Sequence, residues 1–159
     1  MNKFVIYTDG SSRGNPGPGG YGAIILDEKN AKEVGGREKM TTNNRMEITA
    51  AIEALKNIPS DSEVKIFSDS EYLIKGITEW IKNWQKNNWQ TKNKKAVLNK
   101  DLWEELFTET EKRNVEWKKV LGHSGHEFNE RCDEIATDFA DGKNVKLYNG
   151  SKSGYFLVS

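Results

Sequence analysis

The stretch that decides the fold is KFVIYTDG, residues 3–10. Its apolar and β-branched residues from Phe4 to Thr8 form a run that is typical of a strand buried on both faces. We expect this strand to end at Asp9, and residues 10–12 to turn the chain away. The end of a buried strand is where an α/β sheet usually presents its chemistry. Asp9 is therefore the first candidate for a functional residue.

A glycine-rich stretch, GNPGPGGYG at 14–22, follows this strand. Its Gly17-x-Gly19-x-x-Gly22 spacing formally matches a dinucleotide-binding fingerprint, but that fingerprint must open a helix. Here it leads into AIIL at 23–26, which predicts a strand, and the Gly-Lys-Ser/Thr of a P-loop is missing. We therefore expect a tight link between antiparallel strands and no nucleotide cofactor. A weaker pattern predicts a third strand within 31–40.

A strand–helix–strand order continues the chain. Ile48, Ala51, Ile52 and Leu55 share one face of a helix that Pro59 stops. The stretch EVKIFSDS at 63–70 repeats the opening pattern, a short strand that ends in aspartate and serine. The order fits an α/β sheet in which Asp9 and Asp69 lie at neighbouring strand ends.

The acids beside these elements also have purely structural interpretations. Glu47, expected in the first helical turn, would complete a capping box with Asn44. Asp69 would cap the next helix, or a box of Ser68 and Glu71 would do so. Both alternatives stay open for the residues taken singly.

A fourth acid, Asp133, comes from the last predicted helix, 127–141. It lies one position beside an apolar stripe to which Cys132 belongs as a small core residue, so it faces either a site at the rim or solvent. Together, Asp9, Glu47, Asp69 and Asp133 predict one cluster at the sheet edge. Two carboxylates about 4 Å apart repel by about 4 kcal/mol at an effective dielectric near 20. Only protons or hard divalent cations make such a cluster tolerable.

A basic segment stands apart in a chain whose 24 basic and 24 acidic residues cancel. Six lysines and no acid lie between Trp80 and Lys100, which gives this segment a charge of +6. Lysines interleaved with tryptophans suit the backbone and bases of a nucleic acid. The alternative is a solvated helical hairpin that is packed by its tryptophans.

A histidine loop, LGHSGH at 121–126, follows the last predicted strand, 114–120. His123 there suits a proton shuttle or a phosphate contact, although a lone loop histidine is more often only solvated. Zinc binding by His123, His126 and Cys132 is disfavoured, because structural zinc sites need four ligands and favour cysteine pairs.

The bulk properties favour one cytoplasmic domain. A chain of 159 residues suits a single core, its one cysteine allows no internal disulfide, and no apolar run is long enough for a signal peptide or a membrane span.

The tail beyond residue 141 is polar and we expect it to be loosely held, with YFLV at 155–158 either docking back or meeting a partner.

Several long blocks of the sequence closely resemble bacterial-type (type one) ribonuclease H, a family that cuts the RNA strand of RNA–DNA hybrids. They are TDGSSRGNPGPGGYGAI at 8–24, TTNNRMEITAAIEAL at 41–55, SDSEY at 68–72, WIKNWQKNNWQTKNKK at 80–95, DLW at 101–103 and GHSGHEFNERCDEIA at 122–136. The resemblance covers residues 4 to about 140. It implies an α/β ribonuclease H-like fold, with a five-stranded mixed sheet flanked by helices and a basic helical protrusion at about 80–100. The expected domain is 1–141, with a poorly matched tail at 142–159.

The resemblance also implies an activity and a set of site residues. The expected reaction is two-metal hydrolysis of the RNA strand, leaving 3′-hydroxyl and 5′-phosphate ends, with two Mg²⁺ ions or Mn²⁺ as a substitute. It makes Asp9, Glu47, Asp69 and Asp133 the metal ligands, and His123 an aid to water activation or product release. The residues that it implies in hybrid binding are Asn15, Thr42, Asn43, Asn44, Ser70, Trp80, Trp84, Lys86, Lys92, Lys94 and Lys95. Thr42 would belong to a DNA-phosphate pocket, and Trp80 and Trp84 would face the DNA strand. The expected protein is a monomer that binds a hybrid duplex and no membrane.

The sequence departs from the usual residues of this family at two places, and two other functions stay open as alternatives. Glu71 stands where many relatives have Gln, and Glu127-Phe128 replaces a commoner Pro-Glu pair. The rivals are another nuclease of the same fold, such as a Holliday-junction resolvase or transposase core, and a non-catalytic hybrid-binding module. The basic protrusion and the His123 loop argue against the first rival, and the presence of all four acids argues against the second.

Overall fold

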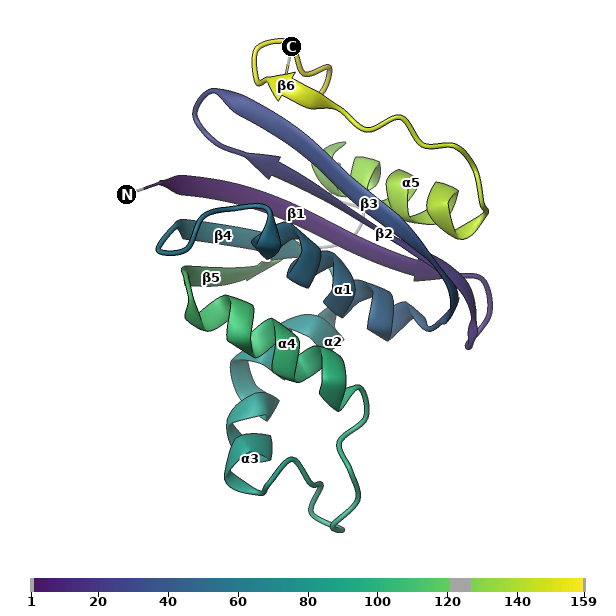
Figure 1. The fold of residues 1–159 in the computed structure, drawn as a ribbon, viewed down its shortest axis with the longest axis vertical. Helices are drawn as coiled ribbons and strands as arrows, with labels where there is room; N and C mark the ends of the chain where they lie inside the picture. Colours follow the sequence, from purple (N-terminus) through teal and green to yellow (C-terminus); the bar gives the residue numbers. More distant parts are fainter. Residues whose placement is uncertain (1, 121–126, 159) are drawn as a thin grey trace.

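A computed structural model describes residues 2–120 and 127–158 and shows one mixed sheet between helices (Figure 1). In chain order the elements are β1 (Lys3–Ser12), β2 (Gly17–Leu26), β3 (Asn30–Thr41), α1 (Asn43–Lys56), β4 (Glu63–Ser68), α2 (Glu71–Lys75), the π-helical turn η1 (Gly76–Trp80), α3 (Ile81–Lys86), α4 (Lys100–Glu111), β5 (Asn114–Lys119), α5 (Glu127–Ala140) and β6 (Asn149–Ser151). The strand order is β5-β4-β1-β2-β3-β6, with β1, β4 and β5 parallel and the other neighbours antiparallel. No helix in the described ranges is long and apolar enough to cross a membrane.

The sheet has six strands in the described residues, one more than the five that the sequence predicts. The extra strand, β6, comes from the tail and pairs with Asn30–Lys32 of β3. Its three residues, Asn-Gly-Ser, are polar and show no alternation, so no local pattern marks them as a strand. Only pairing with the exposed edge of β3 makes them one.

The opening strand is longer than expected. The prediction that β1 ends at Asp9 is wrong, because pairing with β2 continues from Asp9–Gly22 to Ser12–Gly19. The parallel neighbour on the other side, β4, ends at Ser68. Asp9 therefore lies inside β1 but beyond the last residue of β4, at a step in the sheet edge.

The glycine-rich stretch links two antiparallel strands, as the sequence predicts, and its glycines have a packing role. A Cβ on Gly20 would lie 2.2 Å from the backbone oxygen of Ala136, and one on Gly22 would lie 2.7 Å from that of Cys132. Both oxygens belong to α5. The missing side chains on β2 therefore allow α5 to pack directly on the backbone of the sheet.

Two apolar cores lie on opposite faces of the sheet, under α1 and α5 (Figure 1). The larger core, on the α1 side, includes Ile6, Ile52 and Trp103, all at most 2% exposed. The smaller core, on the α5 side, includes the fully buried residues Cys132 and Tyr155. The interpretation of Cys132 as a core residue is thus confirmed.

The tail docks back onto the body, so the prediction that it is loosely held is wrong for residues 148–155. Tyr155 is fully buried, and its ring centroid lies 4.9 Å from that of Tyr148. Of the two alternatives for residues 155–158, docking back is the one observed. The sequence of residues 141–154 is polar and gives no sign of this docking. The segment is anchored by the buried Tyr155 that follows it and by the strand β6 within it.

The close approach of β2 and α5 yields a stability prediction. Gly20→Ala places a methyl group against the backbone of α5, which cannot move aside like the end of a side chain, so we expect a loss of about 1–3 kcal/mol in the free energy of unfolding. Urea denaturation measures this loss. Gly150→Ala is the control, because its new Cβ would meet only the ring and hydroxyl of Tyr148, 3.0–3.5 Å away. Equal stability of the two variants would contradict the packing role of Gly20.

Candidate active site

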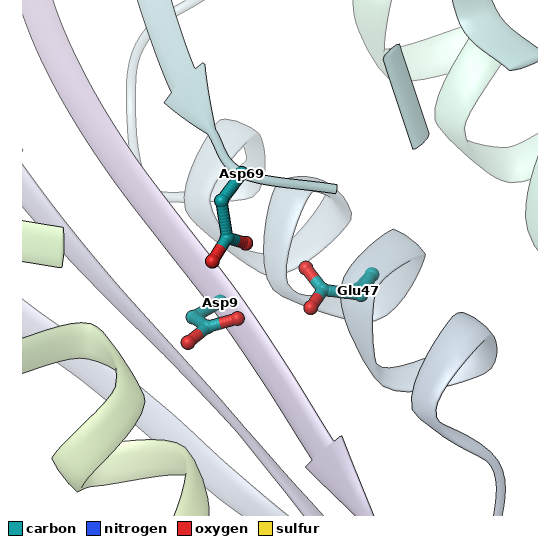
Figure 2. A group of neighbouring side chains, drawn as sticks. All are labelled: Asp9, Glu47 and Asp69. Carbon is teal, nitrogen blue, oxygen red and sulfur yellow. The ribbon is translucent and has the colours of Figure 1, made fainter. Parts of the chain in front are cut away.

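Three carboxylates from three different elements meet at the step in the sheet edge (Figure 2). One oxygen each of Asp9, Glu47 and Asp69 lies within 4.8 Å of the others. Asp9 and Glu47 are buried, at 5% and 8% exposure, while Asp69 is more open. The side chains point toward a common centre, with Asp9 on β1, Glu47 on α1 and Asp69 directly after β4.

The register of two parallel strands brings Asp9 and Asp69 together. Lys3 of β1 pairs with Glu63 of β4, and Tyr7 pairs with Phe67, so the offset is 60 residues throughout. Continued beyond the end of β4, the same offset places Asp9 opposite Asp69. The prediction that these two acids come together on neighbouring strands follows from this register, although only Asp69 follows a strand end and Asp9 lies inside β1.

A close approach of α1 to β1 brings in Glu47. A Cβ on Gly10 would lie 2.4 Å from the backbone nitrogen of Glu47, so the glycine next to Asp9 allows the helix backbone to touch the strand. Sequence reasoning missed this function of Gly10. The available signal was a glycine directly after the candidate acid of a buried strand, where close approach of another backbone is a usual reason for glycine.

The capping alternatives for Glu47 and Asp69 are wrong. Thr42 caps α1, its hydroxyl accepting a hydrogen bond from the Arg45 amide, and Glu47 lies beyond the first turn rather than in it. Ser70 caps α2 by accepting from the Leu73 amide. Both acids are therefore available for a site.

The electrostatics of the cluster favour a bound cation. Burial, aided by the charges of Asp69 and Asp133, raises the pKa of Asp9 to about 7. Burial and the charge of Asp9 raise the pKa of Glu47 well above its ordinary value. The Oε2 atom of Glu47 is buried and has no hydrogen-bond partner in the described structure. An orphaned carboxylate oxygen among three acids is an all-oxygen donor set of the kind that hard divalent cations prefer.

Asp133 stands at the rim of this cluster rather than inside it. It is the seventh residue of α5 and lies beyond the first turn of this helix. Its side chain is exposed and is not one of the three mutually close carboxylates. Its charge nevertheless contributes to the raised pKa of Asp9, which places it near the site.

The histidines predicted to act here, His123 and the alternative zinc ligand His126, lie outside the described residues, as does all of 121–126. The predicted role of His123 in water activation or product release stays a prediction, and zinc binding was already disfavoured by the sequence.

The polar residues predicted to bind substrate come from the β1–β2 connection and from the starts of α1 and α2. Asn15 is exposed in the β1–β2 connection, and Asn43 and Asn44 are exposed in the first turn of α1. The Asn43 side chain accepts a hydrogen bond from the Ser12 amide at 2.6 Å, which ties the start of α1 to the end of β1. Thr42 and Ser70 already cap helices, so any contact with substrate would be a second role for each hydroxyl.

The basic segment forms a projection of α3 and an irregular return to α4, away from the sheet (Figure 1). Its lysines at 82, 86, 92, 94, 95 and 100 are exposed, and none pairs with a carboxylate among the described residues. The tryptophans are partly structural. The Trp84 ring lies 5.5 Å from Trp103, 6.0 Å from Trp80 and 6.1 Å from Trp89 between centroids. The segment therefore combines both alternatives that the sequence left open: its tryptophans pack against one another and against Trp103, and its lysines form an exposed basic surface.

Comparison with known sequences gives a consistent result. A model of the RNase H family matches residues 1–141. A Ribonuclease H of Pseudoalteromonas atlantica is 50% identical over 145 residues, which cover 91% of this chain and 95% of that protein. A Ribonuclease H of Acetivibrio thermocellus is 51% identical over 139 residues, which cover 87% and 95%.

Solved structures agree with the sequences. LC9-RNase H1, described as a type 1 RNase H with the type 2 active-site motif, is similar with a TM-score of 0.83 and 29% identity over 99% of this chain and 83% of that chain. LC11-RNase H1 in complex with an RNA/DNA hybrid is similar with a TM-score of 0.60 and 27% identity over 87% and 97%. With a family match over most of its length and relatives at half identity, the chain belongs to the ribonuclease H family.

Proposed function

We propose that this ribonuclease H hydrolyses the RNA strand of RNA–DNA hybrids with two divalent cations, leaving 3′-hydroxyl and 5′-phosphate ends. The observation that carries the proposal is the cluster of Asp9, Glu47 and Asp69 within 4.8 Å, with the Oε2 atom of Glu47 buried and unpartnered. Family membership supports the activity, and the LC11-RNase H1 complex supports the substrate class. Membership of the ribonuclease H family also argues against the two rival nucleases, a Holliday-junction resolvase and a transposase core.

The residues present fit Mg²⁺, with Mn²⁺ as a substitute. Carboxylate oxygens without thiolates are the ligands of hard cations, and Cys132 points elsewhere, donating its thiol hydrogen to the Tyr7 carbonyl at 3.3 Å. Asp9, Glu47 and Asp69 would hold the cations together with Asp133 at the rim. When bound, two such ions stabilise the charge on the attacking and leaving oxygens of a phosphodiester.

The protein's own residues would orient the hybrid. The cluster lies at an open sheet edge, so Asp69 and Asp133 are accessible to a phosphodiester while Asp9 and Glu47 are shielded from water. By resemblance to the family, Asn15, Asn43, Asn44 and Ser70 are the candidates for contacts near the scissile bond, and Thr42 is the candidate for a DNA phosphate. His123 stays a proposed aid to water activation or product release.

The basic protrusion would bind the backbone of the DNA strand. Its exposed lysines, with Lys86, Lys92, Lys94 and Lys95 among them, form no ion pair with a described carboxylate, and Trp80 and Trp84 supply partly exposed rings. A protein that recognises 2′-hydroxyls near the cut and fits DNA closely elsewhere distinguishes hybrids from either pure duplex. A monomeric state and a cytoplasmic location stay predictions.

Loss of one ligand should abolish cleavage. Asp9→Asn and Asp69→Asn each remove a charge that the cations require, so we expect the rate on a labelled hybrid to fall by at least about 100-fold. Hybrid binding, measured in chelator, should survive. Asp61→Asn is the matched control, because Asp61 has a φ of 68° that asparagine also adopts. Wild-type cleavage by either test variant would remove that residue from the site.

The protrusion lysines should contribute to the affinity for a hybrid whatever its base sequence. The triple variant Lys92→Ala, Lys94→Ala, Lys95→Ala should weaken hybrid binding for all sequences and lower the slope of log K against log salt by about 2–3. Filter binding over a range of salt measures both effects. The control removes three exposed lysines from the far end of the sheet (Lys3, Lys29 and Lys65), which changes the net charge equally. Identical behaviour of the two triple variants would refute a specific role for the protrusion.

The pKa of Asp9 predicts how the stability of the metal-free protein depends on pH. Its folded value, about 7, exceeds the unfolded value of about 3.9, so the folded state holds more protons between them. Stability should therefore fall as pH rises from about 4 to about 7, measured as Tm in chelator. Asp9→Asn should flatten this slope. Mg²⁺ should restore stability at the upper end, by about 2.7 kcal/mol at a concentration 100-fold above its Kd. A Tm that rises across this window would contradict the buried cluster.

A further inference from the structure

A buried carboxylate on β3 joins the C-terminal tail to α5. The side chain of Glu33 is fully buried and accepts four hydrogen bonds. Two come from Arg131 of α5, through Nε at 2.7 Å and Nη2 at 3.0 Å. The other two come from the tail, through the Tyr155 hydroxyl at 2.6 Å and the Tyr148 amide at 2.9 Å.

The Arg131 guanidinium is the centre of this arrangement. Besides the bidentate pair with Glu33, its Nη2 donates to the Lys146 carbonyl at 3.1 Å and its Nη1 pairs with Glu134. The Phe156 ring centroid lies 5.6 Å from its central carbon. One side chain of α5 is therefore held by β3 and by the tail from residue 146 to 156.

A buried ion pair contributes little net stability to a fold, because the free-energy cost of removing two charges from water offsets most of their attraction. What a bidentate arginine–carboxylate pair adds is directional precision, since its two parallel hydrogen bonds fix the plane and the position of the guanidinium. On α5, this fixes the rotation and the height of the helix over the sheet.

The residue that needs this precision is Asp133, two positions after Arg131. Its carboxylate is exposed, and among the described residues it forms no hydrogen bond and interacts electrostatically with Arg13. Its position relative to Asp9 therefore depends on the backbone of α5. A helix rotation of about 20° moves a side-chain tip, about 5–6 Å from the axis, by about 2 Å. That is the length of a whole Mg²⁺–oxygen bond, and Mg²⁺ requires a nearly ideal ligand geometry.

We propose that Arg131 is a positioning residue: clamped by Glu33 and the tail segment 146–156, it sets the orientation of α5 at which Asp133 completes the divalent-cation site. The tail is thus a part of the metal site's support. The inference rests on the proposed function, because it takes Asp133 as a ligand of that site.

Metal binding to the full-length, substrate-free protein tests the inference without cleavage. Mn²⁺ titration followed by electron paramagnetic resonance should give a Kd about tenfold weaker for Arg131→Met, the range seen when groups that orient metal ligands are lost. Tyr155→Phe, which changes no charge, should weaken it by about twofold to threefold. Arg131→Lys keeps the charge but cannot form the bidentate pair, so it should resemble Arg131→Met.

A double-mutant cycle separates positioning from general destabilisation. In an Asp133→Asn background, Arg131→Met should change the Mn²⁺ Kd by less than about twofold, because the ligand on which it acts is already lost. Arg113→Met is the matched control: Arg113 is another largely buried arginine, bonded to Glu109 and to the Ile58 carbonyl, remote from α5. It should lower Tm while leaving the Kd unchanged.

Three results would overturn the inference. They are a wild-type Kd for Arg131→Met, full rescue by Arg131→Lys, and an equal loss in the Asp133→Asn background. The second would show that charge rather than orientation matters. If instead the wild-type protein binds Mn²⁺ but does not cut hybrid, the proposed function fails while the positioning of Asp133 still stands.

Discussion

The mutual repulsion of three acids at one edge of the sheet is the constraint on which the structure depends. Asp9 and Glu47 are buried beside Asp69, and burial favours their protonated forms strongly enough to raise both pKa values. At neutral pH the cluster therefore needs protons or cations, and divalent cations are the more useful of the two, because they also stabilise a phosphodiester under attack. The repulsion that raises these pKa values and the proposed catalytic use of the cluster would have the same electrostatic cause.

The backbone around the cluster is built for close approach. Gly10 lets α1 contact β1, which brings in Glu47, while Gly20 and Gly22 let α5 lie directly on β2. The two helices cover opposite faces of the sheet, yet both present an acid to the same edge, because β4 stops short of Asp9. The glycine-rich stretch that resembles a nucleotide-binding loop is thus explained by packing.

Two further segments, the protrusion and the C-terminal tail, would adapt the proposed site to its substrate and its metal. The protrusion offers lysines without acidic partners in the described structure, anchored by tryptophan packing against Trp103. The tail forms a network with Glu33 and Arg131 that anchors α5 two residues before Asp133. One segment provides long-range attraction for a polyanion, and the other provides local rigidity.

Much of the architecture was determined by the sequence alone. Apolar runs and helical periodicity marked the strands and helices, since burial imposes those periods locally, and long blocks of similarity identified the family. The positions of Asp9, Glu47, Asp69 and Asp133 beside these elements predicted one cluster, and the structure brings the first three within 4.8 Å of one another. Only the tertiary structure decided that Thr42 and Ser70, not the acids, cap the helices, because capping depends on backbone angles at one residue. It also decided that β1 continues to Ser12, that Asn149–Ser151 is a strand and that Glu33 is buried with Arg131 and Tyr155. The last two features arise from contacts between residues as many as 122 positions apart, which leave no local pattern to read.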